Sequence, residues 1–328
     1  MLARRRSLCL NGSEIARTPI LLPSFSSKGF PDVQEILRTA EQFIEGEMLV
    51  SAYDLHYGEI SPPFEFSSLV FLDSGGYEAA KDAELSDLRE LDHSPKVWTE
   101  EQYKAVIATL PWKVPTVAIS YDHPRERLSI PHQIDRAKRL LPAKSSTVLR
   151  EILLKPETTD QSLLKISSVI SNIHALAEFD VIGVTEKEIG KSMLARMTSI
   201  AQLRMALTRA GLETPIHVFG SLDTISSPLY FVSGADIFDG LTWLRFAYRD
   251  GLTIYKHNYG ALDLGVDAKV HIVDGRCWFN NYYYLRDMQL EMRRFLSDYD
   301  FGSFRHHADF IREAYRSVAE AEGVKNGR

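Results

Sequence analysis

The stretch Phe71-Leu72-Asp73-Ser74-Gly75-Gly76-Tyr77 indicates how this chain folds and where its chemistry lies. An apolar run, Leu69–Leu72, ends there in a carboxylic acid, a hydroxyl group and two glycines, followed by an aromatic ring. The glycines let the backbone turn sharply and approach a ligand closely. A carboxylate at the exit of a buried strand is how α/β barrels and doubly wound sheets present reactive groups. The alternative is an ordinary turn with a solvated Asp73.

Around this stretch, the chain alternates between short apolar runs and helical patterns, which is typical of a (β/α)8 barrel. The apolar runs are Thr18–Phe25, Met48–Leu55, Leu69–Leu72, Thr116–Asp122, Thr147–Lys155, Asp180–Thr185, Pro215–Gly220 and Ala235–Gly240. A doubly wound sheet usually has a glycine-rich fingerprint after its first strand, and this chain has none. We therefore predict an α/β TIM barrel over residues 1–250, opened by an N-terminal β-hairpin.

Three of the predicted strands end in an acid: Asp73, Asp122 and Asp239 follow the third, fourth and eighth strands. In a closed barrel the carboxyl ends of the strands lie around one rim, where barrel enzymes carry their active sites. We expect the three carboxylates to surround a cavity that holds a purine, with the ring of Tyr77 as one wall. This convergence favours a functional site over a solvated turn.

The remaining chain, residues 251–328, has a different pattern and is predicted to pack on the barrel as a separate extension. Three runs, Gly251–His257, Val270–Val273 and Arg276–Phe279, predict a small β-meander. Asn280–Tyr299 and His306–Ala321 have the apolar spacing of amphipathic helices.

Composition limits the possible functions. The net charge of −6 excludes a generally basic surface, so a polyanion would have to bind a local patch. The two cysteines, Cys9 and Cys277, cannot form a four-ligand thiolate site, and we predict no metal and no cofactor. No apolar run approaches the roughly 20 residues that span a bilayer, so we expect a cytoplasmic protein without a membrane partner.

The order and spacing of three quoted segments resemble those of the tRNA-guanine transglycosylases, which exchange guanine for a 7-deazaguanine in a polynucleotide. The segments are Thr18-Pro-Ile-Leu-Leu-Pro-Ser24, Leu72-Asp-Ser-Gly-Gly-Tyr77 and Asp236-Ile-Phe-Asp-Gly-Leu-Thr-Trp-Leu-Arg245. Ile119–Asp122, Asp180–Gly183 and Val218–Gly220 lie between them in the matching order. The resemblance implies a pentosyltransferase whose partners are tRNA or DNA and a free guanine or 7-deazaguanine base.

By the same resemblance, Asp239 is the nucleophile that attacks the ribose C1′ atom, and Asp73 is the general acid and base. The residues implied in binding the base are Asp122, Ser74, Tyr77, Gly183, Phe219 and Gly220, and those implied in binding nucleic acid are Arg245 and Arg249. The chemistry suits these residue types, because a carboxylate can trap an oxocarbenium-like centre while a second acid protonates the leaving base.

The chain also departs from the family pattern. The family's zinc cluster of three cysteines and a histidine is absent, which leaves open whether tRNA or DNA is the substrate and whether the protein forms a homodimer or binds a partner subunit. Lys155-Pro156 stands where the family has Gln-Gly character. A nucleoside hydrolase or glycosidase on the same barrel, and a non-catalytic nucleic-acid-binding subunit, remain alternatives.

Overall fold

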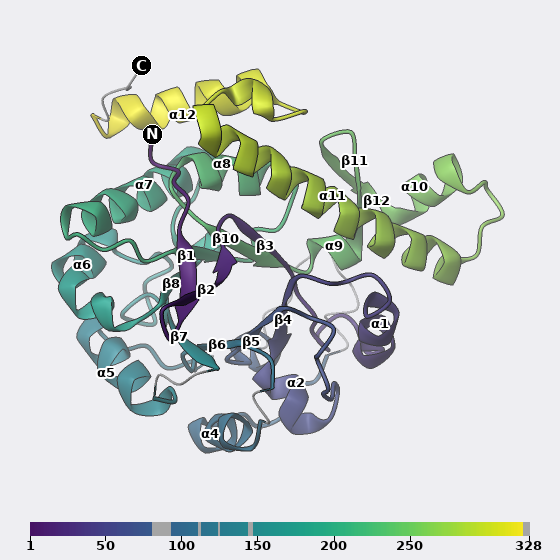
Figure 1. The fold of residues 1–328 in the computed structure, drawn as a ribbon. Helices are drawn as coiled ribbons and strands as arrows, with labels where there is room; N and C mark the ends of the chain where they lie inside the picture. The colour runs from purple at the N-terminus through teal and green to yellow at the C-terminus, as the bar shows by residue number, and fades with distance from the viewer. Residues whose placement is uncertain (81–92, 111–112, 124, 144–146, 324–328) are drawn as a thin grey trace.

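The computed structural model describes residues 1–80, 93–110, 113–123, 125–143 and 147–323, and it contains an eight-stranded parallel barrel surrounded by helices (Figure 1). The barrel strands are β3 (Ile20–Pro23), β4 (Glu47–Ser51), β5 (Leu69–Asp73), β6 (Thr116–Ile119), β7 (Val148–Leu154), β8 (Val181–Thr185), β9 (Ile216–Phe219) and β10 (Ile237–Gly240). Each predicted run contains one of them, which confirms the predicted TIM-barrel-like α/β fold.

The strands pair in the order β3-β10-β9-β8-β7-β6-β5-β4, and the two end strands meet to make the barrel nearly closed. The closing contact is a parallel bridge between Ser24 and Leu49, in which the Phe25 amide donates to the Leu49 carbonyl at 3.0 Å. The second predicted strand is too long at its carboxyl end, because Ala52–Tyr57 forms helix α2 instead.

Side chains of the strands alternate between the inside of the barrel and the layer beneath the helices. The inward set forms one apolar cluster that includes Ile20, Leu22, Leu49, Leu69, Phe71, Val117, Ile119, Leu149, Leu153, Val181 and Ile237. Continuing this period of two places Asp73, Glu151, Gly183, His217, Phe219 and Asp239 on the inward side of their strands. The alternation therefore delivers polar groups to the inside of the barrel from several strands.

Helices cover the outside of the barrel. They are α1 (Val33–Ala40), α2, α3 (Gly76–Ala79), α4 (Glu100–Thr109), α5 (Ile130–Leu140), α6 (Ile166–Ser171), α7 (Met193–Arg209), α8 (Ser226–Val232) and α9 (Thr242–Arg245), with 3-10 turns η2 (Ile173–Glu178) and η3 (Glu186–Glu188). Helix α4 begins with a capping box, in which the Thr99 hydroxyl accepts from the Gln102 amide and the Gln102 side chain accepts from the Thr99 amide. Residues 166–178 form α6 followed by η2.

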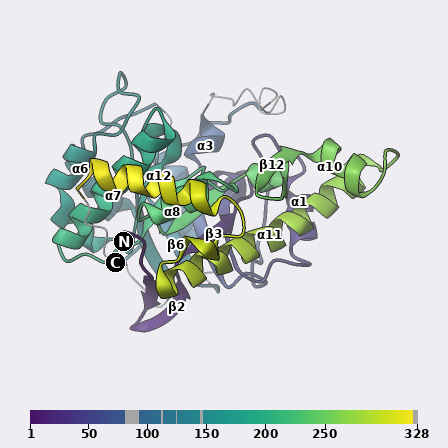
Figure 2. The ribbon, with the colours of Figure 1, turned by 90° about the horizontal axis from the view of Figure 1, so that it is seen from above.

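The N-terminal hairpin closes one end of the barrel. Strands β1 (Ser7–Leu10) and β2 (Ser13–Arg17) are joined by Asn11 and Gly12, both with positive φ, as a two-residue hairpin turn requires. Leu8 and Leu10 join the apolar cluster inside the barrel. Figure 2 shows β2 at one end of the barrel and α3 at the other. The rim that carries the strand exits is therefore the end opposite the hairpin.

The predicted C-terminal meander is wrong beyond its first strand. A hairpin of β11 (Phe246–Arg249) and β12 (Leu252–Tyr255) is followed by α10 (Lys256–Asp263) and by α11 (Val270–Asp298), a helix of 29 residues. A 3-10 turn, η4 (Phe301–Ser303), and a last helix, α12 (Ala308–Ala321), complete the fold.

The error has a physical cause. Val270 and Ile272 are apolar but exposed, so their alternation resembles that of a strand, whereas the buried residues Val273 and Cys277 are four apart and lie on one helix face. The later turns of α11 pack on the barrel through Tyr282, Leu285, Met288, Met292 and Phe295, and the same helix extends toward its N-terminus away from the barrel.

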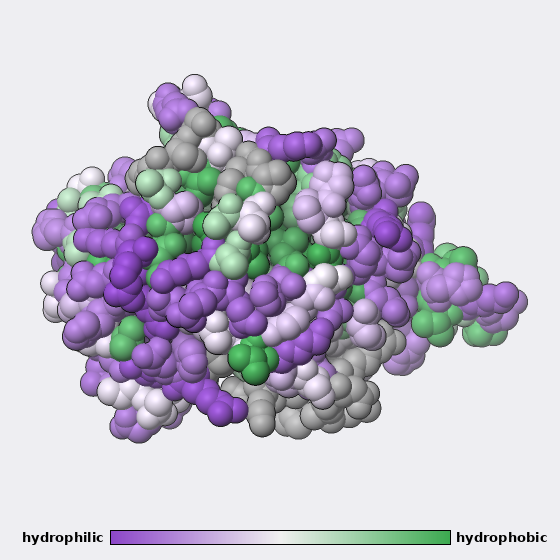
Figure 3. Space-filling view, turned by 90° about the horizontal axis from the view of Figure 1, so that it is seen from below, coloured by the Kyte–Doolittle hydropathy of each residue, from purple (hydrophilic) through white to green (hydrophobic). Residues whose placement is uncertain are grey.

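This extension forms an arm with α10 that projects from the barrel (Figures 1 and 3). The arm presents Leu262, Leu264, Val266, Val270 and Ile272 to solvent, and Figure 3 shows apolar side chains gathered at its tip. Over the part of the chain that the structure describes, no helix is long and apolar enough to cross a membrane.

Candidate active site

The predicted acids lie at the rim opposite the hairpin. Asp73 is the last residue of β5, Asp239 lies in β10 one residue before its end, and Asp122 follows β6 by three residues. The barrel therefore brings the ends of these strands to one face, as the sequence predicted. The space for a purine between the three carboxylates stays a prediction.

Asp239 is held by groups from the ends of the two strands next to β10, which are β3 and β9. Its Oδ2 atom accepts a hydrogen bond from the Ser24 hydroxyl at 2.9 Å, and its Oδ1 atom accepts one from the Gly220 amide at 3.1 Å. Gly220 has φ of +77°, a conformation that favours glycine and that aims its amide at the carboxylate. The Nε2 atom of His217 lies 3.3 Å from Oδ1. Asp239 is 7% exposed, so this carboxylate is fixed in place while still reaching the surface of the rim.

His217 is itself bound to a second carboxylate inside the barrel. Its Nδ1 atom lies 2.8 Å from Oε1 of Glu151, and the side chains of both residues are fully buried. Burial lowers the pKa of His217, but the charges and hydrogen bonds of Glu151 and Asp239 outweigh it and raise that pKa to about 9. The imidazole is therefore protonated at neutral pH and stands between two carboxylates.

Gly183 in β8 makes this contact possible. Strand β8 lies between β7, which carries Glu151, and β9, which carries His217. A Cβ atom at position 183 would lie 2.7 Å from Oε1 of Glu151 and 2.6 Å from the ring of Phe219. The missing side chain lets the groups of two non-adjacent strands meet across β8.

Asp73 has a different environment from Asp239. Burial and the charge of Glu78 raise the pKa of Asp73 to about 7, with a further contribution from Asp239, while the Gly75 amide opposes the shift by donating to Oδ2 at 3.1 Å. Glu78 is buried and accepts hydrogen bonds from the Ser26 and Ser51 hydroxyl groups. Asp73 is thus poised to hold a proton near neutral pH.

The contrast between the two acids matters chemically. The Asp239 carboxylate accepts hydrogen bonds from a hydroxyl and an amide and lies 3.3 Å from the His217 ring, whereas burial and the neighbouring acids raise the pKa of Asp73. Pairs of carboxylates whose environments separate their pKa values can divide the roles of nucleophile and acid.

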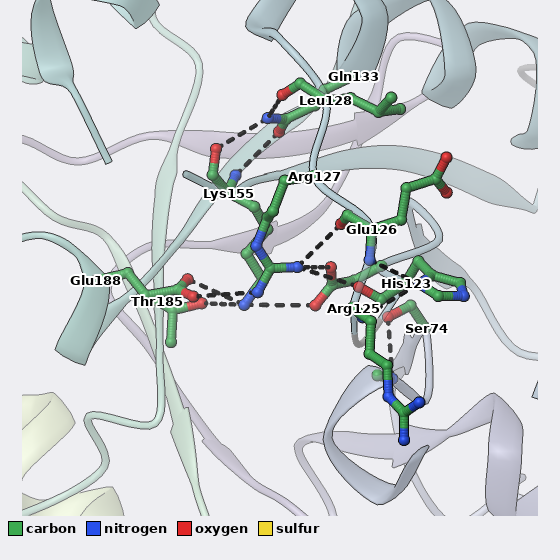
Figure 4. A network of polar contacts seen from close by, with 12 residues as sticks. Ser74, His123, Arg125, Glu126, Arg127, Leu128, Gln133, Lys155, Thr185 and Glu188 are labelled. Carbon is green, nitrogen blue, oxygen red and sulfur yellow. Dashed lines mark hydrogen bonds and ion pairs between the residues drawn. The ribbon is translucent and has the colours of Figure 1, made fainter. Parts of the chain in front are cut away.

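Asp122 belongs to a charged network with Arg127, Lys155 and Glu188, the last three of which are labelled in Figure 4. The Nζ atom of Lys155 lies 3.4 Å from Asp122 and 3.0 Å from Glu188, and it donates to the Thr185 hydroxyl at 2.9 Å. Arg127 lies 3.8 Å from Asp122 and 3.9 Å from Glu188. A carboxylate and an ammonium side by side can bind a partner that offers both donors and an acceptor.

Gly76 allows the network to reach the Asp73 loop. A Cβ atom at Gly76 would lie 3.0 Å from both the carbonyl oxygen and Oδ2 of Asp122. The second glycine of the opening stretch therefore permits close packing between the β5 and β6 exits. The first, Gly75, has φ of +86° and makes the turn itself.

Two further predicted residues, Tyr77 and Arg245, contact each other directly. The Tyr77 hydroxyl accepts from Nη2 of Arg245 at 2.9 Å. The ammonium of Lys28, which is buried, lies 4.4 Å from the centre of the Tyr77 ring and donates to the Tyr77 carbonyl at 3.0 Å. This contact joins the segment Asp236–Arg245 to the stretch Phe71–Tyr77.

The other predicted site residues divide into two groups. Ser74 is buried, and its carbonyl accepts from the Trp98 indole at 2.9 Å, while the Phe219 ring stacks on His217 with centroids 3.9 Å apart. Arg249 lies in the β11–β12 hairpin and pairs there with Asp250 and Asp263. Among the residues that the structure describes, no hydrogen bond or ion pair joins Arg249 to another predicted site residue.

Sequence reasoning missed several polar residues of the site: Ser24, Lys28, Glu78, Glu151 and His217. Glu151 and His217 could have been found from strand alternation, since each is a charged or polar residue at an inward position among apolar neighbours. Ser24 and Lys28 carry no such signal, because their roles depend on where β10 and α3 approach them.

A cavity of about 280 Å³ lies elsewhere, on the outer side of β4, β5 and β6. Its lining is mainly apolar and includes Val50, Leu55, Phe64, Val70, Leu72, Leu110 and Val114. None of the three acids lines it. Within the described ranges, no group of three or more histidine, cysteine, aspartate or glutamate side chains could hold a metal ion.

Comparison with known proteins does not assign this chain. No protein-family model matches it, and no curated protein matches its sequence. The fold and the site define it as a TIM-barrel-like α/β protein with a cluster of acids at the strand exits.

Proposed function

We propose that this protein is a transglycosylase that exchanges guanine for a 7-deazaguanine base in tRNA or DNA. The single observation that carries the proposal is the pairing of two rim acids: Asp239 is held by the Ser24 hydroxyl, the Gly220 amide and His217, and Asp73 has a pKa raised to about 7. Base exchange needs an ionised nucleophile beside a proton donor.

In this proposal, the carboxylate of Asp239 attacks C1′ of the ribose as the C1′–N9 bond breaks. Asp73 gives its proton to the departing guanine, which leaves as the neutral base. Asp73 then takes a proton from the incoming base, whose nitrogen attacks C1′ and releases Asp239. Two displacements retain the configuration at C1′.

Asp122 and Lys155 suit recognition of the base. A carboxylate accepts from the N1–H and amino groups of guanine, and a lysine ammonium donates to its O6 atom. Since both groups lie 3.4 Å apart, one guanine edge could engage them together. Tyr77 would stack on the base, which offsets part of the cost of unstacking it from the polynucleotide.

The test is incorporation of radiolabelled guanine or a labelled 7-deazaguanine into tRNA and into duplex DNA. We expect incorporation into one of the two by the wild-type protein and by Asp309→Asn, a control on the exposed surface of α12, and none by Asp239→Asn. On a denaturing gel, the wild-type protein should show a band in which the polynucleotide is covalently attached to it, and Asp239→Asn should not.

Two outcomes would contradict the proposal. Release of base from nucleosides without incorporation would indicate a hydrolase. Equal background incorporation by the wild-type protein and Asp239→Asn, together with retained binding of nucleic acid, would indicate a non-catalytic binding subunit.

A further inference from the structure

The interior of the barrel contains one charged pair that the proposed exchange reaction does not use directly. Glu151 and His217 lie below the rim among apolar side chains such as Phe71, Leu153 and Val181. The His217 ring packs edge-on against Phe71 and face-on against Phe219. These contacts fix the plane of the imidazole, so that Nδ1 faces Glu151 and Nε2 faces Asp239.

We propose that Glu151 and His217 are a positioning pair, which holds Oδ1 of Asp239 beside a positive charge so that the carboxylate attacks through Oδ2. This inference rests on the proposed function, because it assigns the pair a part in the reaction of Asp239. It also makes a claim about the pair itself that does not depend on any substrate.

The geometry divides the two oxygens of Asp239. Oδ1 faces the imidazole and the Gly220 amide, two fixed groups, whereas Oδ2 accepts from the Ser24 hydroxyl. The Ser24 Oγ atom also accepts from the Gly240 amide at 3.0 Å, which sets the direction of its proton. A carboxylate held at one oxygen by a charged partner cannot rotate freely, so Oδ2 stays beside the Ser24 hydroxyl.

A purely structural role explains the pair less well. Replacing a buried ion pair with apolar residues is often neutral or stabilising, and the surroundings of this pair are apolar. The Oε2 atom of Glu151 is buried without a hydrogen-bond partner among the described residues, so the fold tolerates an unsatisfied polar atom there. Glu151 therefore contributes through its charge on His217 and not through a complete hydrogen-bond network.

The pair also places a positive charge beside Asp239. Asp73 and Glu151 are carboxylic acids whose pKa values respond to the charge of Asp239. Among the described residues, the cation that faces Asp239 is the His217 imidazolium. A positive charge close to one oxygen stabilises the ionised form of a carboxylate. Removing the charge of Glu151 should lower the pKa of His217. The loss of positive charge should then slow the attack of Asp239 on C1′.

The decisive variant is Glu151→Gln, because glutamine has nearly the same shape and can still accept from Nδ1 of His217. In full-length protein with labelled histidine, NMR should find the wild-type His217 imidazole doubly protonated at pH 7. In Glu151→Gln and in Asp239→Asn its titration should move down by at least one pH unit. A neutral His217 at pH 7 in the wild-type protein would overturn the proposal.

The second readout is single-turnover formation of the covalent adduct with the polynucleotide as a function of pH. We expect Glu151→Gln to slow adduct formation about 10- to 100-fold, as loss of a group that orients a reactive ligand does, with KM for the polynucleotide unchanged. A second decline, expected near pH 9 and separate from the one that Asp73 produces near pH 7, should move to lower pH with the His217 titration. An unchanged rate and an unmoved pH profile would overturn the proposal.

The two proposals fail separately. If the wild-type protein forms no adduct, the proposed function fails, while the NMR titration still decides whether the pair is charged and coupled to Asp239. Unfolding by urea serves as the control, since a loss of rate that merely follows a loss of folded protein would count as structural and against the positioning role.

Discussion

Glu151 reaches His217 across β8 because residue 183 has no side chain: a Cβ atom at Gly183 would lie 2.7 Å from Oε1 of Glu151. We therefore expect Gly183→Ala to force apart the ion pair and the Phe219 ring. Overpacking of this kind costs about 1–3 kcal/mol of unfolding free energy, which denaturant titration would measure.

Gly275→Ala is the matched control for that substitution. Gly275 lies inside α11 with nothing within 4 Å of its Cβ position, so alanine should stabilise the protein by about 0.5–1 kcal/mol. Equal effects of the two substitutions would contradict the packing argument.

The stability of the protein should fall as pH rises from about 6.5 to about 9. The pKa of His217 is about 9 in the folded state and about 6.5 when unfolded, so its contribution is complete below pH 6.5 and lost as pH rises through 9. The full contribution is at most about 3 kcal/mol. Urea titrations at pH 6, 7.5 and 9 would measure it, and His217→Gln should flatten the curve while the exposed His174→Gln should not.

Base release in a single turnover should depend on a proton held by Asp73. Because burial and Glu78 raise the pKa of Asp73 to about 7, we expect the rate to be constant at acid pH and to fall about tenfold per pH unit above 7. Asp73→Asn should lower the rate about 10²- to 10⁴-fold and remove this break. A rate that stays level between pH 6 and 9 would rule out Asp73 as the acid.

Lys155 should contribute to binding of the free base. Lys155→Met removes the ammonium that lies 3.4 Å from Asp122, so we expect guanine to bind about 1–3 kcal/mol more weakly, as measured by calorimetry. The exposed Lys165→Met is the control. If Lys155→Met binds guanine with an unchanged dissociation constant, guanine does not bind beside Lys155.

Asp236 should be essential for stability and not for chemistry. Its carboxylate binds Arg6 at 2.9 Å, Arg204 at 2.5 Å and the Ile216 amide at 2.8 Å, and all three side chains are buried. Asp236→Asn leaves the buried guanidinium of Arg204 without its carboxylate and leaves Arg6 with Glu213 as its remaining anionic partner, which should cost about 3–5 kcal/mol. Denaturant unfolding would measure this loss, whereas Asp309→Asn should change the free energy by less than about 0.5 kcal/mol.

The sequence by itself determined the barrel. The regular spacing of apolar runs predicts eight strands, and the period of two within each run fixes which side chains point inward. Asp73 and Asp239 could be placed at the rim because strand ends in a parallel barrel share one face. The positions of the strands and their inward side chains depend on residues that are near in sequence, so they can be predicted without knowing the contacts between distant residues.

Only the tertiary structure decided which charges meet. The contacts of Glu151 with His217, of Lys155 with Asp122 and of Tyr77 with Arg245 join residues from different strands or loops, and they depend on register, on the barrel's closure and on the gap at Gly183. The sequence predicted the second half of α11, Asn280–Tyr299, but not its first turns, because Val270 and Ile272 there are apolar and exposed and resemble a strand.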